Sequence, residues 1–434
     1  MCEWVKLKIA KCLIGHWAGV WGAEPDDWHT PSRVLRSTEI DEYGHLDLDG
    51  GVYRYIPGGV AQKAIRRGDI LIETSGGTPD RPVGRVALVR NDPDGPTFCS
   101  NFVRVLRTND RIEPEYLTWL LVSLSKSQDI LRYQQQTTGI INLNVRDFLD
   151  HEIIVPACRR DQVARCEVFR SVDTRITHTE ALIAKQEQVR AGLMQDLFAR
   201  GVDETGRLRP PREEAPELYH ETVLGWLPRA WDAVPVRDIA NVVRGSTPRP
   251  AKDPRYFDGS FVPWITVGEL SREDWPYLET TLSHLTELGA KFSRLLPSET
   301  LVISNSGYGC GVPKLLKIDG CANDGIAALL DLSKAYEPLF LYYWFYSNID
   351  TLRTRFARGN DQPNLNTDII GNLLVPRPAK HEQKSIADRV WCVQLAIERL
   401  RQESRKLGQL RTALIRGLLC PTLAVAVDTR MAAE

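Results

Sequence analysis

The sequence repeats itself at long range, and this repeat constrains the fold more than any other feature of the chain. Asn142–Asn144 has the same sequence as Asn364–Asn366, 222 residues later, and Ile70–Gly76 resembles Leu301–Gly307. This period is far longer than the roughly 20 to 50 residues of a solenoid repeat. The duplication therefore concerns whole domains, and we expect two halves with the same architecture.

Each half ends in a long segment without proline, residues 159–200 and 380–420, in which apolar residues recur at spacings of three and four. This pattern is typical of a coiled-coil seam, and a helix of this length spans roughly 60 Å. Arginine occupies the equivalent seam position of both segments, Arg190 and Arg411, which indicates a similar geometry in both halves. We predict that the helices pack against each other through Phe169, Val172, Ile176, Ile183, Leu193, Leu197, Val390, Val393, Ile397, Leu400, Leu407, Leu414 and Leu418.

The rest of each half, residues 1–158 and 216–379, contains short β-like runs broken by Gly, Pro, Asn and Asp. With the helical stretches, these runs indicate two globular domains. Residues 201–215 are rich in proline and charge, which predicts an exposed linker, and we expect the tail 421–434 to be flexible. The predicted fold class is α+β, with two duplicated α/β domains joined by two long helices that form an antiparallel coiled-coil spacer.

The sequence favours a cytoplasmic protein. No apolar stretch approaches the ~18 residues of a membrane span, and the N-terminus lacks the continuous apolar region of a signal peptide. The nine cysteines are odd in number and never form Cys-x-x-Cys, which is typical of reduced thiols in the cytoplasm. None of the eight histidines belongs to a His-x-x-x-His pair, so we expect no metal site.

The motifs of several enzyme classes are missing from the sequence. It contains neither a Gly-x-x-x-x-Gly-Lys-Ser/Thr loop nor a Gly-x-Ser-x-Gly elbow. The Asn/Asp-Pro-Pro-aromatic tetrapeptide with which an amino-methyltransferase grips a flipped base is also absent. Gly307-Tyr308-Gly309-Cys310-Gly311 lacks the Gly-x-Gly-x-x-Gly spacing and precedes an apolar run, so we interpret it as a turn between strands and not as a nucleotide-binding loop. We expect a chain without catalytic residues.

An ordered set of motifs resembles the specificity (S) subunit of type I restriction–modification enzymes. The set comprises Leu227–Ala240, Gly245–Pro248 followed by Tyr256–Thr266, Gln362–Asn366 and the linker beginning at Gly201. The resemblance extends over nearly the whole chain and is looser in the first globule.

This resemblance implies that each globule is a target recognition domain that reads one half of a split sequence in double-stranded DNA. It also implies that the helices act as an antiparallel spacer and dock two methyltransferase subunits. S-adenosylmethionine would be bound by the methyltransferase, and this chain would bind no cofactor itself. Motor-nuclease subunits can join such a complex.

The net charge of −1 excludes DNA binding by bulk positive charge alone. Residues 1–155 carry 18 basic and 21 acidic side chains, and residues 216–378 carry 16 and 19. Phosphate binding would then depend on local clusters and on the methyltransferase. Base reading requires side chains with paired donors and acceptors on protruding loops. The candidates are Thr74, Ser75, Arg81, Arg85, Arg244, Thr247, Arg249, Asn305, Ser306, Tyr308 and Lys314.

Some polar residues recur in both halves, namely Ser75 with Ser306 and Asn101 with Asn323. Domains that read different sequences should differ where they contact bases, so we interpret the recurring residues as shaping turns and favour the others for specificity. Two alternatives stay open: a DNA-modifying enzyme that acts alone, and a coiled-coil adaptor that binds only protein. Activity of the isolated chain, or an absence of sequence-selective DNA binding, would distinguish them.

Overall fold

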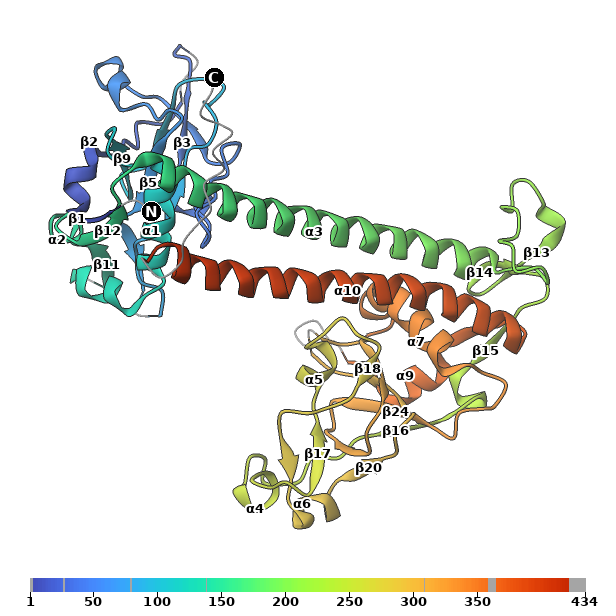
Figure 1. Ribbon diagram of the computed structural model, residues 1–434. Helices are drawn as coiled ribbons and strands as arrows, with labels where there is room; N and C mark the ends of the chain where they lie inside the picture. Colours follow the sequence, from blue (N-terminus) through green and yellow to red (C-terminus); the bar gives the residue numbers. More distant parts are fainter. Residues whose placement is uncertain are drawn as a thin grey trace. The chain divides into compact units, whose positions relative to one another are not determined.

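A computed structural model describes residues 3–25, 28–78, 80–137, 139–307, 309–357 and 364–420 (Figure 1). The predicted flexible tail, 421–434, lies outside these ranges. The chain divides into two compact units, Met1–Thr179 with Glu403–Glu434, and Glu180–Gln402. Two long helices, α3 (Arg159–Arg200) and α10 (Lys380–Leu418), contribute to both units. The fold is mixed helix and sheet with a pair of long helices, which confirms the predicted α+β class.

The first unit is built on a four-stranded antiparallel sheet of order β2-β9-β5-β7. Smaller sheets have the orders β4-β3-β8, β10-β11-β6 and β1-β12. The elements are β1 (Trp4–Lys8), β2 (Leu13–Ala18), β3 (Ser32–Leu35), β4 (Val52–Arg54), β5 (Asp69–Glu73), β6 (Ser75–Gly77), β7 (Val86–Leu88), β8 (Thr97–Cys99), β9 (Val103–Thr108), α1 (Pro114–Ser125), β10 (Gln134–Thr137), β11 (Ile140–Leu143), α2 (Val145–Leu149) and β12 (Glu152–Pro156).

The second unit contains a five-stranded sheet of order β16-β24-β21-β22-β18 and a four-stranded sheet of order β19-β17-β23-β20. The pairs β13-β14 and β15-β25 complete it. Its elements are β13 (Tyr219–Thr222), β14 (Gly225–Pro228), β15 (Asp232–Pro235), β16 (Asn241–Arg244), α4 (Pro254–Phe257), β17 (Val262–Ile265), α5 (Val267–Ser271), β18 (Tyr277–Leu278), β19 (His284–Leu285), α6 (Glu287–Lys291), β20 (Arg294–Leu296), β21 (Leu301–Ser304), β22 (Pro313–Leu316), β23 (Gly320–Ala322), β24 (Ile326–Leu330), α7 (Pro338–Ser347), α8 (Ile349–Thr351), α9 (Thr367–Asn372) and β25 (Leu374–Arg377).

The two units share one topology. The order β16-β24-β21-β22 corresponds to β2-β9-β5-β7, and the parallel pair β17/β23 corresponds to β3/β8. In each unit one helix, α1 or α7, packs into the core between the main sheet and the long helices. The predicted duplication is therefore present in the strand order as well as in the sequence.

The structure corrects one detail of the repeat. Ser100 N donates to Leu35 O at 2.7 Å, and Asn323 N donates to Ile265 O at 3.0 Å. These bonds close the parallel pairs β3/β8 and β17/β23, so Ser100 and Asn323 occupy the same position. Asn101 then corresponds to Asp324, one residue away from the equivalence that the sequence suggests. The predicted match of Asn101 with Asn323 is wrong, because strand pairing and not the shared cysteine sets the register.

A buried glutamine fixes the start of each long helix. Gln162 Oε1 accepts a hydrogen bond from Glu113 N at 2.7 Å, and Gln383 Oε1 accepts one from Glu337 N at 2.9 Å. Each amide nitrogen donates to the carbonyl of a proline that ends or follows the preceding strand. Both side chains are fully buried, and burial of an amide requires such partners. The repeated glutamine therefore joins helix, strand and α1 or α7.

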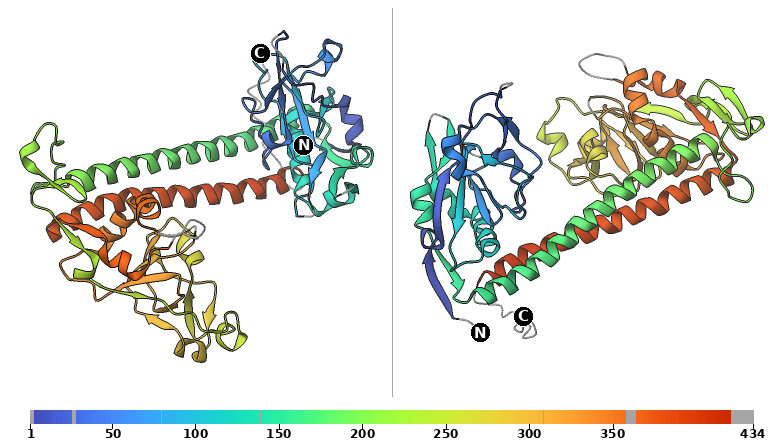
Figure 2. Two further views of the ribbon diagram at one scale, coloured as in Figure 1. Left: turned by 180° about the vertical axis from the view of Figure 1, so that it is seen from behind. Right: turned by 90° about the horizontal axis from the view of Figure 1, so that it is seen from above.

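Ion pairs show that the long helices are antiparallel within each unit (Figure 2). In the first unit Arg411 NH1 lies 3.1 Å from Asp173 Oδ1, and Glu403 Oε1 lies 2.9 Å from Arg175 NH2. In the second, Arg401 NH2 lies 2.6 Å from Glu187 Oε1, and Gln394 contacts Arg190. In both units, later residues of α3 contact earlier residues of α10. None of the thirteen predicted seam residues is exposed. The predicted apolar stripe therefore lies at least partly in the interior of the units.

Two further expectations can be compared with the structure. The segment around Gly309 connects the antiparallel strands β21 and β22, as predicted for a turn. Seven of the described cysteines are free thiols, but Cys158 is disulfide-bonded. The expectation of reduced thiols throughout is therefore wrong at Cys158, which follows the strand β12 that pairs with β1. Among the described residues, no helix is long and apolar enough to cross a bilayer.

Candidate nucleic-acid interface

In each unit three segments that lie at or near strand ends meet at one edge of the fold. They are residues 18–24, 74–78 and 100–102 in the first unit, and 244–249, 305–307 and 323–325 in the second. We call these the first and second edge loops. The same backbone hydrogen bonds join them: Thr74 N donates to Phe102 O at 2.8 Å, and Asn305 N donates to Gly325 O at 2.8 Å.

A glycine is required at the same point of both edges. A Cβ on Gly19 would lie 2.1 Å from Cys99 O, and a Cβ on Gly245 would lie 2.1 Å from Asn323 O. Since real Cβ atoms do not approach backbone this closely, only glycine allows the loop to cross the neighbouring strand end. The frame of the edge loops is therefore common to both units.

The side chains mounted on this common frame differ. Two residues after the shared glycine, the first unit has Trp21 and the second has Thr247. The ring of Trp21 is covered by the Arg54 guanidinium at 4.6 Å. At the corrected register, Asn101 occurs where the second unit has Asp324. One backbone thus presents two chemically different surfaces.

Asp324 joins the second edge loops into one cluster. Its Oδ1 accepts a hydrogen bond from Thr247 Oγ1 at 2.7 Å, and its Oδ2 accepts one from Arg249 NH2 at 3.0 Å. Its backbone carbonyl accepts from Arg244 Nε at 2.5 Å. The hydroxyl of Thr247 and the two arginines hold the pKa of this carboxyl below its usual value. We call these four residues the Asp324 clasp.

The structure brings together only some of the predicted contact residues. Arg244, Thr247 and Arg249 belong to the clasp, and Arg249 keeps 70% of its side chain exposed. Asn305 lies beside them but is buried. Ser306 forms an isolated bridge with Asn364. Tyr308 lies outside the described residues.

Lys314 does not reach the edge. Its buried Nζ donates to Glu273 O at 2.6 Å and to Trp275 O, and burial lowers its pKa to about 8. The ammonium group is therefore used to hold the segment 273–275, and we leave Lys314 out of the proposed DNA surface.

In the first unit the predicted residues also separate into two kinds. Thr74 and Ser75 lie at the edge, where Ser75 Oγ donates to Asn142 Oδ1 at 2.5 Å. Arg81 is 60% exposed and lies 3.5 Å from Glu73. Arg85, in contrast, donates to both oxygens of the buried Glu73 at 2.8 and 2.9 Å and to two backbone carbonyls. Its donors are occupied within the unit, so we also leave Arg85 out of the surface.

Comparison with known proteins gives consistent results. An S subunit of a type I restriction–modification system from M. genitalium has the same fold, with a TM-score of 0.59 over 98% of this chain and 97% of that chain at 16% identity. The MjaVIII specificity subunit of Methanocaldococcus jannaschii is 20% identical over 340 residues, 76% of this chain and 74% of its own. The HindI specificity subunit of Haemophilus influenzae is 22% identical over 376 residues, 74% of this chain and 79% of its own.

The family model described as type I restriction modification DNA specificity domain matches residues 228–405. Over most of its length the chain is similar to type I specificity subunits. The matched span contains the second edge loops, with the Asp324 clasp, and most of α10. The predicted resemblance to type I specificity subunits is therefore confirmed.

The sequence pattern did not indicate all the residues that complete the second edge. Asp324 is acidic, and the chemistry of DNA binding favours basic and amide side chains, so the sequence did not single it out. Ser293 Oγ donates to Ser246 O at 2.6 Å and so fixes the loop from its other side. Phe292 is 56% exposed and packs edge-to-face on Tyr256 at 5.6 Å. The aromatic residue before Ser293, Phe292, is the only sequence feature that could have drawn attention to this segment. Nothing in the sequence shows that the segment lies beside Ser246.

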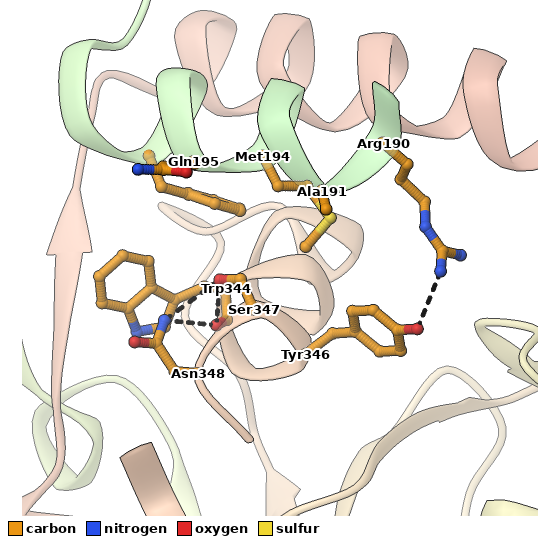
Figure 3. Close-up of a pocket in the computed structure, with 9 residues that line it drawn as sticks. Arg190, Ala191, Met194, Gln195, Trp344, Tyr346, Ser347 and Asn348 are labelled. Carbon is orange, nitrogen blue, oxygen red and sulfur yellow. Dashed lines mark hydrogen bonds between the residues drawn. The ribbon is translucent and has the colours of Figure 1, made fainter. Parts of the chain in front are cut away.

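The seam arginines, Arg190 and Arg411, connect the globular part of each unit to the long helices. In the second unit Arg190 NH1 donates to Asp274 Oδ2 at 3.1 Å and NH2 to Tyr346 Oη at 3.0 Å, and NH1 also contacts Gln394 on α10. Figure 3 shows Arg190 and Tyr346 at a groove of about 580 Å³ between α3 and the end of α7. The loop carrying Asp274 is thereby held on both helices.

In the first unit a histidine, His45, attaches a loop of the globular part to α3. The His45 ring lies with Nδ1 2.8 Å from Asp41 Oδ2 and Nε2 3.3 Å from Asp173 Oδ2 on α3. Arg411 of α10 pairs with the same Asp173 and lies 3.8 Å from the Tyr43 ring centroid. Hydrogen bonds that the protonated ring donates to Asp173 and Asp41 raise the pKa of His45 to about 9.

We expect the contact between this loop and α3 to weaken as pH rises from about 6.5 to about 9. The folded-state pKa of His45 lies above the usual value of about 6.5. The stability that the protonated ring contributes is therefore fully present below pH 6.5 and is lost as the pH rises through about 9. Hydrogen exchange of residues 41–47, measured at pH 6 and pH 9 and corrected for intrinsic rates, should show increased opening. In His45→Gln, the change in opening between pH 6 and pH 9 that remains after this correction should disappear. An equal change in the variant and the wild-type protein would contradict the role of His45.

Proposed function

We propose that this chain is the DNA-reading subunit of a type I restriction–modification complex. Residues 1–158 and 216–379 act as recognition domains, each of which reads one half of a bipartite target in double-stranded DNA. The main support is that the same backbone arrangement occurs at both edges but carries different side chains. Trp21 in the first unit corresponds to Thr247 in the second, and Asn101 corresponds to Asp324. Equal frames allow both domains to approach the duplex in the same way, while different side chains allow an asymmetric target.

The chain reads DNA and its partners supply the chemistry in this proposal. Two methyltransferase subunits dock on the helices 159–200 and 380–420, bind S-adenosylmethionine and modify a base flipped out of the duplex. Motor-nuclease subunits can join the complex, which works in the cytoplasm. The excess of three acidic residues in each recognition region supports shared DNA binding, because phosphate contacts then have to come mainly from local arginines and from the methyltransferase.

The experiment that tests this function is a domain exchange in the complex with the methyltransferase of the same system. Methylated sites are mapped in a genome before and after residues 1–158 are replaced by another recognition domain. We expect one half of the target to change and the other half to stay the same. DNA binding by the complex should also fall steeply with salt.

The outcomes separate the alternatives. Methylation or cleavage by the isolated chain would establish an enzyme that acts alone. A complex without sequence-selective DNA binding would favour a protein-only adaptor. An exchange that altered both half-sites together would contradict one domain for each half.

A further inference from the structure

The Asp324 clasp is built unlike an ordinary surface ion pair. Thr247 Oγ1 both donates to Asp324 Oδ1 at 2.7 Å and accepts from Asp324 N at 3.1 Å, so the carboxylate is fixed to its own backbone. Ser246, one residue earlier, is fixed by Ser293 at 2.6 Å. The loop that carries Arg249 is therefore held on both sides. A side chain that extends from such a support keeps its direction, as specific recognition requires.

Arg249 retains most of its hydrogen-bonding capacity. In the part of the chain that the structure describes, its guanidinium makes one hydrogen bond, from NH2 to Asp324 Oδ2 at 3.0 Å. A guanidinium has five N–H donors in a planar fork, and 70% of this side chain is exposed. The carboxylate orients the guanidinium on one side and leaves another edge of the fork available to a ligand.

The charge of the clasp argues against a phosphate ligand. Asp324 is 39% exposed beside Arg249, and a carboxylate repels the charged phosphate backbone much more strongly than a neutral base edge. In the major groove, guanine presents O6 and N7, which accept two parallel N–H bonds from one arginine. The cytosine of such a pair presents an N4 amino group that can donate to a carboxylate.

We infer that Arg249, positioned by Asp324, reads a guanine in the half of the target bound by the second recognition domain. This inference rests on the proposed function and adds the identity of one base pair to it. It applies to one half-site only. Four residues after the shared glycine, the first unit has Ala23 in place of Arg249, and Asn101 takes the place of Asp324.

The test uses the full chain in complex with its methyltransferase. Methylation rates are measured on duplexes that carry the wild-type target or a single substituted base pair in the second half-site. The wild-type complex should require a G·C pair at one fixed position there. Arg249→Lys keeps the charge but loses the planar fork, and Arg249→Ala loses both. Both variants should reduce discrimination at that pair by roughly 5- to 150-fold, with discrimination in the first half-site unchanged.

Arg255→Ala is the matched control. Arg255 is also 70% exposed and also pairs with a nearby carboxylate, Asp253, at 2.7 Å, and its loss should leave discrimination unchanged. Asp324→Asn keeps an acceptor for Thr247 but removes the charge. We expect reduced discrimination together with stronger binding to non-target DNA, because the repulsion of phosphates is gone. Thermal melting of each variant checks that the unit stays folded.

Several results would overturn the inference. One is a wild-type target without a G·C pair in the second half-site. Another is a uniform loss of methylation in Arg249→Ala with unchanged discrimination, rescued by Arg249→Lys, which would assign Arg249 to a phosphate. Unchanged discrimination in Asp324→Asn would remove the positioning role of Asp324. A wild-type complex with no sequence preference at all would instead contradict the proposed function, so the two failures are distinguishable.

Discussion

Glu382→Ala is expected to lower the unfolding free energy of the second unit by about 3–5 kcal/mol, because it breaks a buried ion pair and leaves the groups that donate to Glu382 without an acceptor. Glu382 is 4% exposed in the first turn of α10. Its Oε1 accepts from Val202 N at 2.9 Å and from Arg209 NH1, and its Oε2 accepts from Trp231 Nε1 at 3.1 Å. Without the carboxylate these donors stay buried and lack an acceptor.

Chemical denaturation, combined with hydrogen exchange of residues 201–209, measures this loss. Glu382→Gln keeps one acceptor oxygen and should lose less stability than the alanine variant. Asp388→Ala is the control on the same helix, since Asp388 pairs with Lys384 at 3.1 Å in an exposed position, where an ion pair contributes roughly 0–1 kcal/mol. Equal losses in Glu382→Ala and Asp388→Ala would show that the buried carboxylate does not hold the linker and the helix together.

The sequence was sufficient to predict the large-scale architecture for a physical reason. Duplicated domains preserve the residues that close the same backbone contacts, and these residues recur visibly. Gln162 and Gln383 are an example, since each bonds the start of α1 or α7. Asn144 and Asn366 are another, because each caps the helix that follows it, α2 or α9. The helix seams were predictable because their spacing is local and needs no knowledge of the partner.

The candidate site was less predictable, because its side chains depend on contacts between distant segments. Arg85 and Lys314 look like DNA-contacting residues in the sequence, yet one pairs with Glu73 and the other bonds carbonyls of the segment 273–275. Asp324 looks unfavourable for binding DNA until Thr247 and Arg249 are seen to converge on it. Basic residues in a sequence show where charge is available, and only the fold shows which charges are already paired.

Lengthening the helix pair is expected to change the spacing between the two half-sites of the target. The change consists of four helix-forming residues inserted after Thr179 in α3 and four after Gln402 in α10, the points at which the chain passes from one compact unit to the other. Four residues add about 6 Å and slightly more than one turn. Because the duplex rises roughly 3.4 Å per base pair, mapping of methylated sites should show a spacing longer by one or two base pairs, with both half-sites unchanged.

The insertion points leave the anchoring contacts in place, and this makes the result interpretable. Arg411 with Asp173 lies within the first unit and Arg190 with Gln394 within the second, so each unit keeps its own contacts between the long helices. A four-residue insertion after Val223, which is 89% exposed between β13 and β14, is the control. It lengthens the chain equally without lengthening a helix and should leave the spacing unchanged. If the helix insertion also left the spacing unchanged while both half-sites were still read, the helices could not be what sets the spacing, and the separation would have to be determined by the methyltransferase subunits.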